Sequence, residues 1–120
     1  MANIETSVNQ AIDIDGCLGA CLVDYESGMC LGLAGNPGFD LELAAAGNAD
    51  VVRAKKTIRD KLKLQDQIED ILITLATQYH LIRMVGTNMF LYVALDRHKS
   101  NLAMARKELA NIEKNLEVDR

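Results

Sequence analysis

The hydrophobic positions change their period several times along the chain, and each change marks a predicted element. Residues 3–13 repeat every three or four positions, which predicts an amphipathic helix. A similar repeat after Ser100 predicts a final helix, with Ser100 as its N-cap. The first stripe consists of Ile4, Val8, Ala11 and Ile12. The second consists of Leu102, Ala105, Leu109, Ile112 and Leu116.

Residues 17–24 and 29–35 alternate between two sides instead, which is typical of strands. The Ser-Gly turn between them has hairpin length, so we expect the two strands to pair antiparallel. We expect a register that gathers small residues on one face: Val23 opposite Cys30, Cys21 opposite Gly32, and Gly19 opposite Ala34. A helix could approach such a face closely.

A long helix and three further strands follow. Asp40 can cap the helix, and its pattern runs to about Leu62. Residues 68–77, 79–85 and 89–96 predict strands, and a tight Gly-Thr-Asn turn joins the last two. The order of helix, two strands, helix, three strands and helix belongs to the α+β class. Because hairpins make nearly all the strand connections, the five-stranded sheet should be antiparallel with helices covering it.

Residues 71–77 contain neither a charged residue nor a proline. A strand that follows a long helical crossover is a natural sheet edge, and edges usually carry Lys, Pro or a bulge that prevents pairing with another chain. An interior position would explain why these devices are missing. We prefer the other interpretation, in which a second chain adds edge to edge.

The middle helix carries two apolar stripes, whereas a surface helix needs only one. Gly47 costs about 1 kcal/mol relative to alanine inside a helix, which suggests that its small size serves close packing. Both stripes could pack within one domain, but we prefer a symmetric dimer in which the second stripe meets its own copy. The first stripe is Leu43, Gly47, Val51, Ala54, Ile58 and Leu62. The second is Leu41, Ala44, Ala45, Asn48 and Val52.

Composition limits the number of domains, the classes of partner and the expected cellular location. The 120 residues allow one domain, and we expect a single domain over residues 1–120. The net charge of −4 disfavours nucleic acid and anionic membranes as partners. Three cysteines in a chain that needs no disulfide predict free thiols and a cytoplasmic location. Residues 1–10 show no signal peptide, and the longest apolar run, 89–95, is too short for membrane insertion.

The chain lacks the motifs that enzymes and metal sites require. His80 and His98 have no ligand spacing, and no phosphate-binding loop is present, so we expect no catalytic residue, no cofactor and no metal. Basic residues gather near the end of the middle helix, where they match the negative end of the helix dipole. They could alternatively dock an acidic partner surface. These residues are Arg53, Lys55, Lys56, Arg59, Lys61 and Lys63.

Taken together, these patterns resemble the roadblock/dynein light chain domain family. The resemblance is carried by the hairpin of residues 16–33, the Ala-rich middle helix, strands 79–83 and 91–95, and the ending 95–106 with its Asp-Arg, Asn-Leu and Ala-Arg pairs. It covers residues 3–116. The turn at 24–28 is one residue longer than the commonest form in the family.

The resemblance implies a profilin- or longin-like sandwich of three layers in the order α-β-β-α-β-β-β-α. The middle helix would cover one face of a five-stranded antiparallel sheet and the terminal helices the other. It also implies homodimers joined through the third strand and the middle helix into one continuous sheet. On this chain the implied contact comprises Leu41, Ala44, Ala45, Asn48, Val52, Ile71, Ile73 and Leu75.

Members of this family are usually noncatalytic. They bind small Ras-like GTPases in bacteria and archaea, and serve as scaffold or motor-associated subunits in eukaryotes. The resemblance therefore implies a homodimeric adaptor that modulates the nucleotide cycle or location of such a GTPase, docked near Arg53, Lys56 and Arg59. A small-molecule sensing module and a purely structural subunit like the dynein light chains stay open as alternatives.

Overall fold

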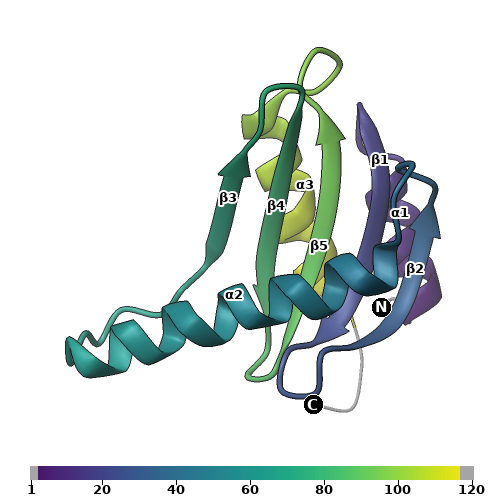
Figure 1. The fold of residues 1–120 in the computed structure, drawn as a ribbon. Helices are drawn as coiled ribbons and strands as arrows, with labels where there is room; N and C mark the ends of the chain where they lie inside the picture. Colours follow the sequence, from purple (N-terminus) through teal and green to yellow (C-terminus); the bar gives the residue numbers. More distant parts are fainter. Residues whose placement is uncertain (1–2, 117–120) are drawn as a thin grey trace.

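The computed structural model describes residues 3–116. Its helices and strands follow one another in the predicted order (Figure 1). They are α1 (Ile4–Ile12), β1 (Cys17–Asp24), β2 (Met29–Gly35), α2 (Leu41–Lys61), β3 (Asp70–Thr74), β4 (Gln78–Val85), β5 (Met89–Asp96) and α3 (Leu102–Asn115). Within residues 3–116, no helix has both the length and the apolar character that crossing a membrane requires.

The strands form one antiparallel sheet in the order β2-β1-β5-β4-β3. Figure 1 shows α2 on one face of this sheet and α1 and α3 on the other. The predicted α+β class and the implied three-layer arrangement are therefore confirmed. The strand after the long helix, β3, lies at one edge as predicted, and β2 forms the other edge.

Each face of the sheet has its own hydrophobic core. On one side, Val8 of α1 and Leu109 of α3 pack against Leu22 and Leu91 of the central strands. On the other side, α2 packs against a second set of strand residues. This second core includes Cys21, Val23, Ala45, Val52, Ile82, Phe90 and Tyr92. Because β5 lies at the centre between both cores, all of its residues from Met89 to Leu95 are buried, which explains a strand that is apolar on both sides.

The β1–β2 hairpin departs from the expected register. Val23 pairs with Cys30 as predicted, but Cys21 pairs with Leu33 instead of Gly32. The shift arises because Leu31 is left between the partners of two consecutive β1 residues, which is a β-bulge. No local signal marks this extra residue in the sequence, since Leu31 continues the alternation.

Small residues of the hairpin allow α1 to lie close to the sheet. Gly32 faces α1, and a Cβ atom on Gly32 would lie 2.5 Å from Cγ2 of Ile4. A side chain at this position would therefore push α1 away from the sheet. The expected close approach of a helix exists and the helix is α1, whereas the register differs from the one predicted.

Capping side chains fix where the helices begin. Asp40 caps α2 as predicted. Asn101 and not Ser100 caps α3, because the Asn101 side chain accepts the Met104 N–H at 3.1 Å. The Ser100 hydroxyl donates instead to the Asp96 carbonyl oxygen at 2.6 Å, so it holds the end of β5 to the start of the loop.

Candidate interaction surface

The β3 strand presents an open backbone edge. At the two ends of its pairing with β4, the Met84 N–H donates to the Glu69 carbonyl at 3.0 Å and the Leu75 N–H donates to the Gln78 carbonyl at 2.8 Å. Antiparallel pairs alternate between bonded and non-bonded, so every second β3 residue directs its backbone groups away from β4. These outward residues are Asp70, Leu72 and Thr74.

The side chains of β3 add an apolar margin to this edge. Ile71 and Ile73 are half-buried on the α2 side of the sheet. The strand ends at Thr74, earlier than the predicted residue 77, because the chain turns back at Leu75. Leu75 is 42% exposed just beyond the end of the strand. The pairing of β3 with β4 shows no register shift, so the edge is regular over its whole length.

The face that α2 turns outward differs from the one that we expected. Leu41, Ala45 and Val52 are buried against the sheet of the same chain, so they have no surface left for a second copy. This corrects that part of the expected dimer contact. Ala44 and Asn48 lie at the margin of the helix and are half-buried.

The first apolar stripe of α2 is the outward one. Leu43 is 71% exposed, and Leu62, just after the helix, is 62% exposed. Figure 1 shows why the end of this stripe is open: the last turns of α2 extend past the sheet beyond β3. None of the strands within residues 3–116 lies beneath that part, and Ile58 is 46% exposed.

A groove of about 330 Å³ lies beside the N-terminal half of α2. Phe39, Leu43 and Gly47 line it together with two rings of the sheet, His80 and Tyr92. The Tyr92 hydroxyl is 3.1 Å from Nδ1 of His80. Burial lowers the pKa of His80, so the imidazole is neutral at physiological pH. The groove is therefore mostly apolar and without a fixed charge from this ring.

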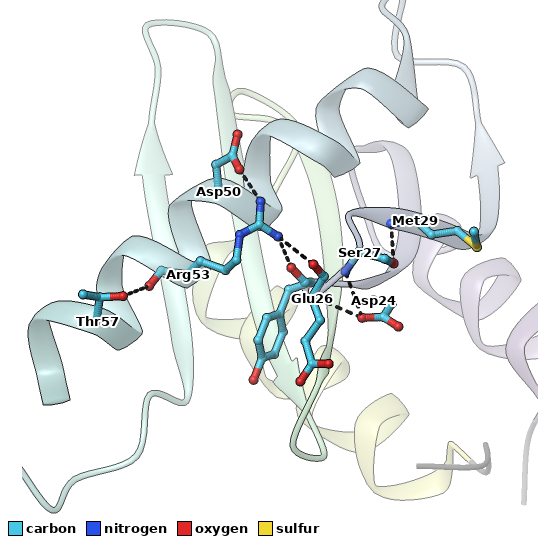
Figure 2. Close-up of polar contacts among 8 residues, drawn as sticks. Asp24, Glu26, Ser27, Met29, Asp50, Arg53 and Thr57 are labelled. Carbon is cyan, nitrogen blue, oxygen red and sulfur yellow. Dashed lines mark hydrogen bonds and ion pairs between the residues drawn. The ribbon is translucent and has the colours of Figure 1, made fainter.

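Arg53 ties α2 to the turn between β1 and β2. Figure 2 shows its guanidinium between the Asp50 carboxylate and the turn. There it donates to the carbonyl oxygens of Tyr25 and Glu26. The Asp24 carboxylate fixes the turn from within by accepting the Glu26 N–H at 2.9 Å. Arg53, one of the expected docking residues, thus stabilises the packing of α2 on the β1–β2 turn of the same chain.

Lys56 and Arg59 are also held by their own chain. Lys56 Nζ contacts the Tyr25 hydroxyl and lies 4.8 Å from the centre of that ring. Arg59 donates to Gln67 Oε1 at 2.8 Å and to Asp60 at 2.9 Å, and its side chain is only 19% exposed. The spacing of three places Arg53, Lys56 and Arg59 along one side of α2.

Tyr25 is the residue of this surface that the sequence did not reveal. It is only 5% exposed although it lies in a turn. Its hydroxyl donates to the Thr87 carbonyl and accepts from Lys56, so it joins the β4–β5 turn to α2. A large aromatic residue inside a hairpin turn was the available signal, because a solvated turn rarely needs one.

The cysteines do not supply a reactive thiolate to the candidate interaction surface. Cys17, Cys21 and Cys30 are free. Burial raises the pKa of Cys17 to about 11 and raises the pKa of Cys21 as well, so both thiols stay protonated at neutral pH. Among residues 3–116, no three or more His, Cys, Asp or Glu side chains gather in a way that could hold a metal ion.

Solved structures share this architecture, although no family model and no curated protein matches the chain. A Roadblock/LC7 domain from Streptomyces avermitilis superposes with a TM-score of 0.83 at 13% identity, over 95% of this chain and 94% of that chain. Myxococcus xanthus MglB gives 0.76 at 20% identity, over 92% and 85%. An MglB structure with a tetrameric arrangement gives 0.67 at 16% identity, over 91% and 86%. The chain therefore has the roadblock/LC7 fold, and the resemblance expected from the sequence is confirmed at the level of the fold.

Proposed function

We propose that this chain is a roadblock-type adaptor that forms a homodimer, binds a small Ras-like GTPase and catalyses no reaction itself. The dimer rests on one observation. β3 is an open edge of the sheet, α2 runs past that edge (Figure 1), and the outward stripe of α2 is apolar and exposed. Unpaired strand groups and exposed apolar side chains are both stabilised by a second chain. The GTPase follows from the family resemblance that the sequence carries.

In the proposed dimer, two β3 strands pair antiparallel across a twofold axis. The backbone groups of Asp70, Leu72 and Thr74 would then bond to the same segment of the second copy. The end of α2 that extends past β3 would lie over the partner's sheet. This placement covers Ile58 and Leu62, which the isolated chain leaves exposed.

The charges along α2 support an antiparallel arrangement of the two helices. Residues 40–52 contain three acids and no basic residue. Residues 53–63 contain six basic residues and a single acid, Asp60. An antiparallel pair brings each acidic half beside a basic half, whereas a parallel pair would oppose like charges. Gly47 and Ala54 on the outward stripe allow the two helices to approach closely.

The proposed dimer contact has two parts. One part consists of the predicted interface residues that are not buried within the chain, and the other is the outward stripe of α2. From the prediction it keeps Ala44, Asn48, Ile71, Ile73 and Leu75. The outward stripe adds Leu43, Gly47, Val51, Ala54, Ile58 and Leu62. Sedimentation equilibrium should give twice the 13.2 kDa chain mass, and a mass of one chain at high concentration would contradict the dimer.

We place GTPase docking on the basic side of α2, with Arg53, Lys56 and Arg59. A regulator needs only a different affinity for the two nucleotide states, which a contact with the switch loops provides. Because all three side chains are held within the chain, we expect them to supply charge and shape at the surface. None of them is free to extend toward a nucleotide.

Binding to the GTPase encoded by the same organism tests this function. We expect calorimetry to show about tenfold tighter binding to one nucleotide form, a difference of about 1.4 kcal/mol. Arg59→Glu should weaken binding, whereas Lys107→Glu on α3, across the sheet, should not. Equal affinity for the GTP-analogue and GDP forms, or no binding to either, would contradict a nucleotide-dependent regulator.

A further inference from the structure

A pocket of about 360 Å³ opens between the C-terminal half of α2, the segment after it and the β4–β5 turn. Lys56 and Arg59 line it from the helix, and Gly86 and Thr87 line it from the turn. The remaining lining residues are Gln67, Ile68 and Met84. The pocket thus combines two cations, two further polar side chains and an apolar patch.

The polar side chains of this pocket offer hydrogen-bond donors, and none of the lining residues is acidic. Lys56 donates one of its three N–H groups to the Tyr25 hydroxyl, so two remain for a ligand. Arg59 donates three of its five N–H groups to Asp60 and Gln67, so two remain for a ligand. Since Gln67 Oε1 already accepts from Arg59, its amide N–H groups are the part left for a ligand.

Both cations are in place before a ligand arrives. Lys56 lies over the ring of Tyr25, and Tyr25 in turn contacts the Thr87 carbonyl on the opposite wall. Arg59 is fixed by the 2.8 Å hydrogen bond to Gln67. No carboxylate among residues 3–116 forms a salt bridge with Lys56. Side chains ordered in advance lose little entropy on binding, which favours capture of an anion.

We propose that this pocket binds a small phosphate monoester. A phosphate group presents three oxygens and about two negative charges, which suits a pocket lined by the donors Lys56, Arg59 and Thr87. A carboxylate presents two oxygens in one plane and would leave part of this donor set unused. The volume of about 360 Å³ leaves space beyond the phosphate for the ester group, which would lie against Ile68 and Met84.

Occupation of the pocket has a regulatory consequence that rests on the proposed function. The bound phosphate neutralises Lys56 and Arg59, two of the three basic residues at the proposed docking surface. The ligand and the GTPase would therefore compete, and each would weaken the binding of the other by the same factor. Binding of the ester itself requires neither the dimer nor the GTPase.

An NMR titration of the ¹⁵N-labelled chain tests the ligand class, with phenyl phosphate, inorganic phosphate and benzoate at equal ionic strength. We expect saturable shifts at Gln67, Gly86 and Thr87 with phenyl phosphate and weaker binding of inorganic phosphate, which lacks the apolar group. Benzoate should bind about tenfold more weakly than phenyl phosphate. No saturable shift at these residues, or equal affinity for benzoate, would overturn the proposal.

Matched charge removals test the site. Arg59→Met and Lys56→Met should each weaken phenyl phosphate binding about tenfold. Lys55→Met removes the same charge from the same helix outside the pocket and should change nothing. An equal loss in Lys55→Met, or full affinity in a folded Arg59→Met, would refute the site. Because no GTPase is present, failure here is separate from failure of the proposed function.

Discussion

The two edges of the sheet differ in backbone more than in polarity. The β2 strand contains no charged residue, and β3 has only Asp70 at its start, paired with Arg106 at 3.0 Å. The bulge at Leu31 interrupts the register of β2, whereas β3 pairs with β4 without a shift from end to end. Because bulges are one device by which proteins prevent edge pairing, β3 is the edge that a second strand can extend.

The neighbours of the two edges differ as well. Along β2, Met29 and Leu33 are 62% and 46% exposed. Near β3, the last turns of α2 extend past the sheet (Figure 1). The apolar outward stripe ends there with Ile58 and Leu62, both exposed. The comparison teaches that exposed apolar side chains on an edge strand do not by themselves define an interface. A regular open backbone with an apolar helix beside it makes the stronger case.

The largest expected effect comes from proline at the open edge. Thr74→Pro removes an N–H that points away from β4, so pairing within the chain survives while pairing with a second copy is blocked. We expect the dimer dissociation constant to rise about a hundredfold, as measured by analytical ultracentrifugation. Thr74→Val keeps the N–H and serves as the control. Leu33→Lys should leave the dimer intact, and dissociation by this β2 variant would reverse the comparison of the edges.

Two adjacent valines separate the inner and outer faces of α2. Val52 is fully buried, so Val52→Ala should lower the free energy of unfolding of the chain by about 2 kcal/mol in urea denaturation. Val51 is half-buried on the outward stripe, and Val51→Ala should instead weaken the dimer. If Val52→Ala dissociated a fully stable chain, the buried stripe would be the interface after all.

The contact between α2 and the β1–β2 turn should matter for stability and not for association. Arg53→Met removes the hydrogen bonds to the β1–β2 turn, and we expect a loss of about 1 kcal/mol because the side chain is partly exposed. Asp50→Asn should cost less, about 0.5 kcal/mol or below, since the Asp50 side chain is 76% exposed. Thermal unfolding measures both. If the Arg53→Met dimer dissociated at unchanged stability, Arg53 would belong to the dimer interface and the contradiction with this account would be direct.

The smallest expected effect is a pH dependence of stability and dimer association that arises from His80, next to β3. His80 pairs with Ile73, and burial lowers its pKa below the ordinary value of 6.5. A lowered pKa means that the folded chain favours the neutral ring, so stability is complete above the unfolded value and is lost as pH falls toward the folded value. Deeper burial in the dimer should make association weaken over the same window. Sedimentation from pH 7 to pH 5 checks this, and His80→Asn should flatten the profile, whereas His98→Asn should not.

The order of elements and the β3 edge could be predicted because their signals are local. Alternation, helical spacing and turn residues placed the strands, and a long crossover helix placed β3 at an edge. Asp40 identified the start of α2 for the same reason, since a cap acts on the next turn of its own helix. Such features depend on few neighbours.

The inward face of α2 could not be predicted because it depends on what the sheet supplies. Phe90 and Tyr92 fill the space beneath the helix, so Ala45 and Ala49 fit there better than larger residues. The stripe with more large aliphatic residues, Leu43 through Leu62, was therefore the outward one. The bulge at Leu31 and the contacts of Arg53 were hidden for a similar reason, as both are set by segments distant in the sequence.

Amide hydrogen exchange along β3 tests the central claim most directly. In the proposed dimer the N–H groups of Leu72 and Thr74, which point away from β4, are protected as strongly as those of Ile71 and Ile73, which bond to β4. Dilution below the dissociation constant should release the first pair and leave the second protected. Fast exchange of Leu72 and Thr74 at high protein concentration, beside slow exchange of Ile71 and Ile73, would contradict a β3 edge closed by a second copy.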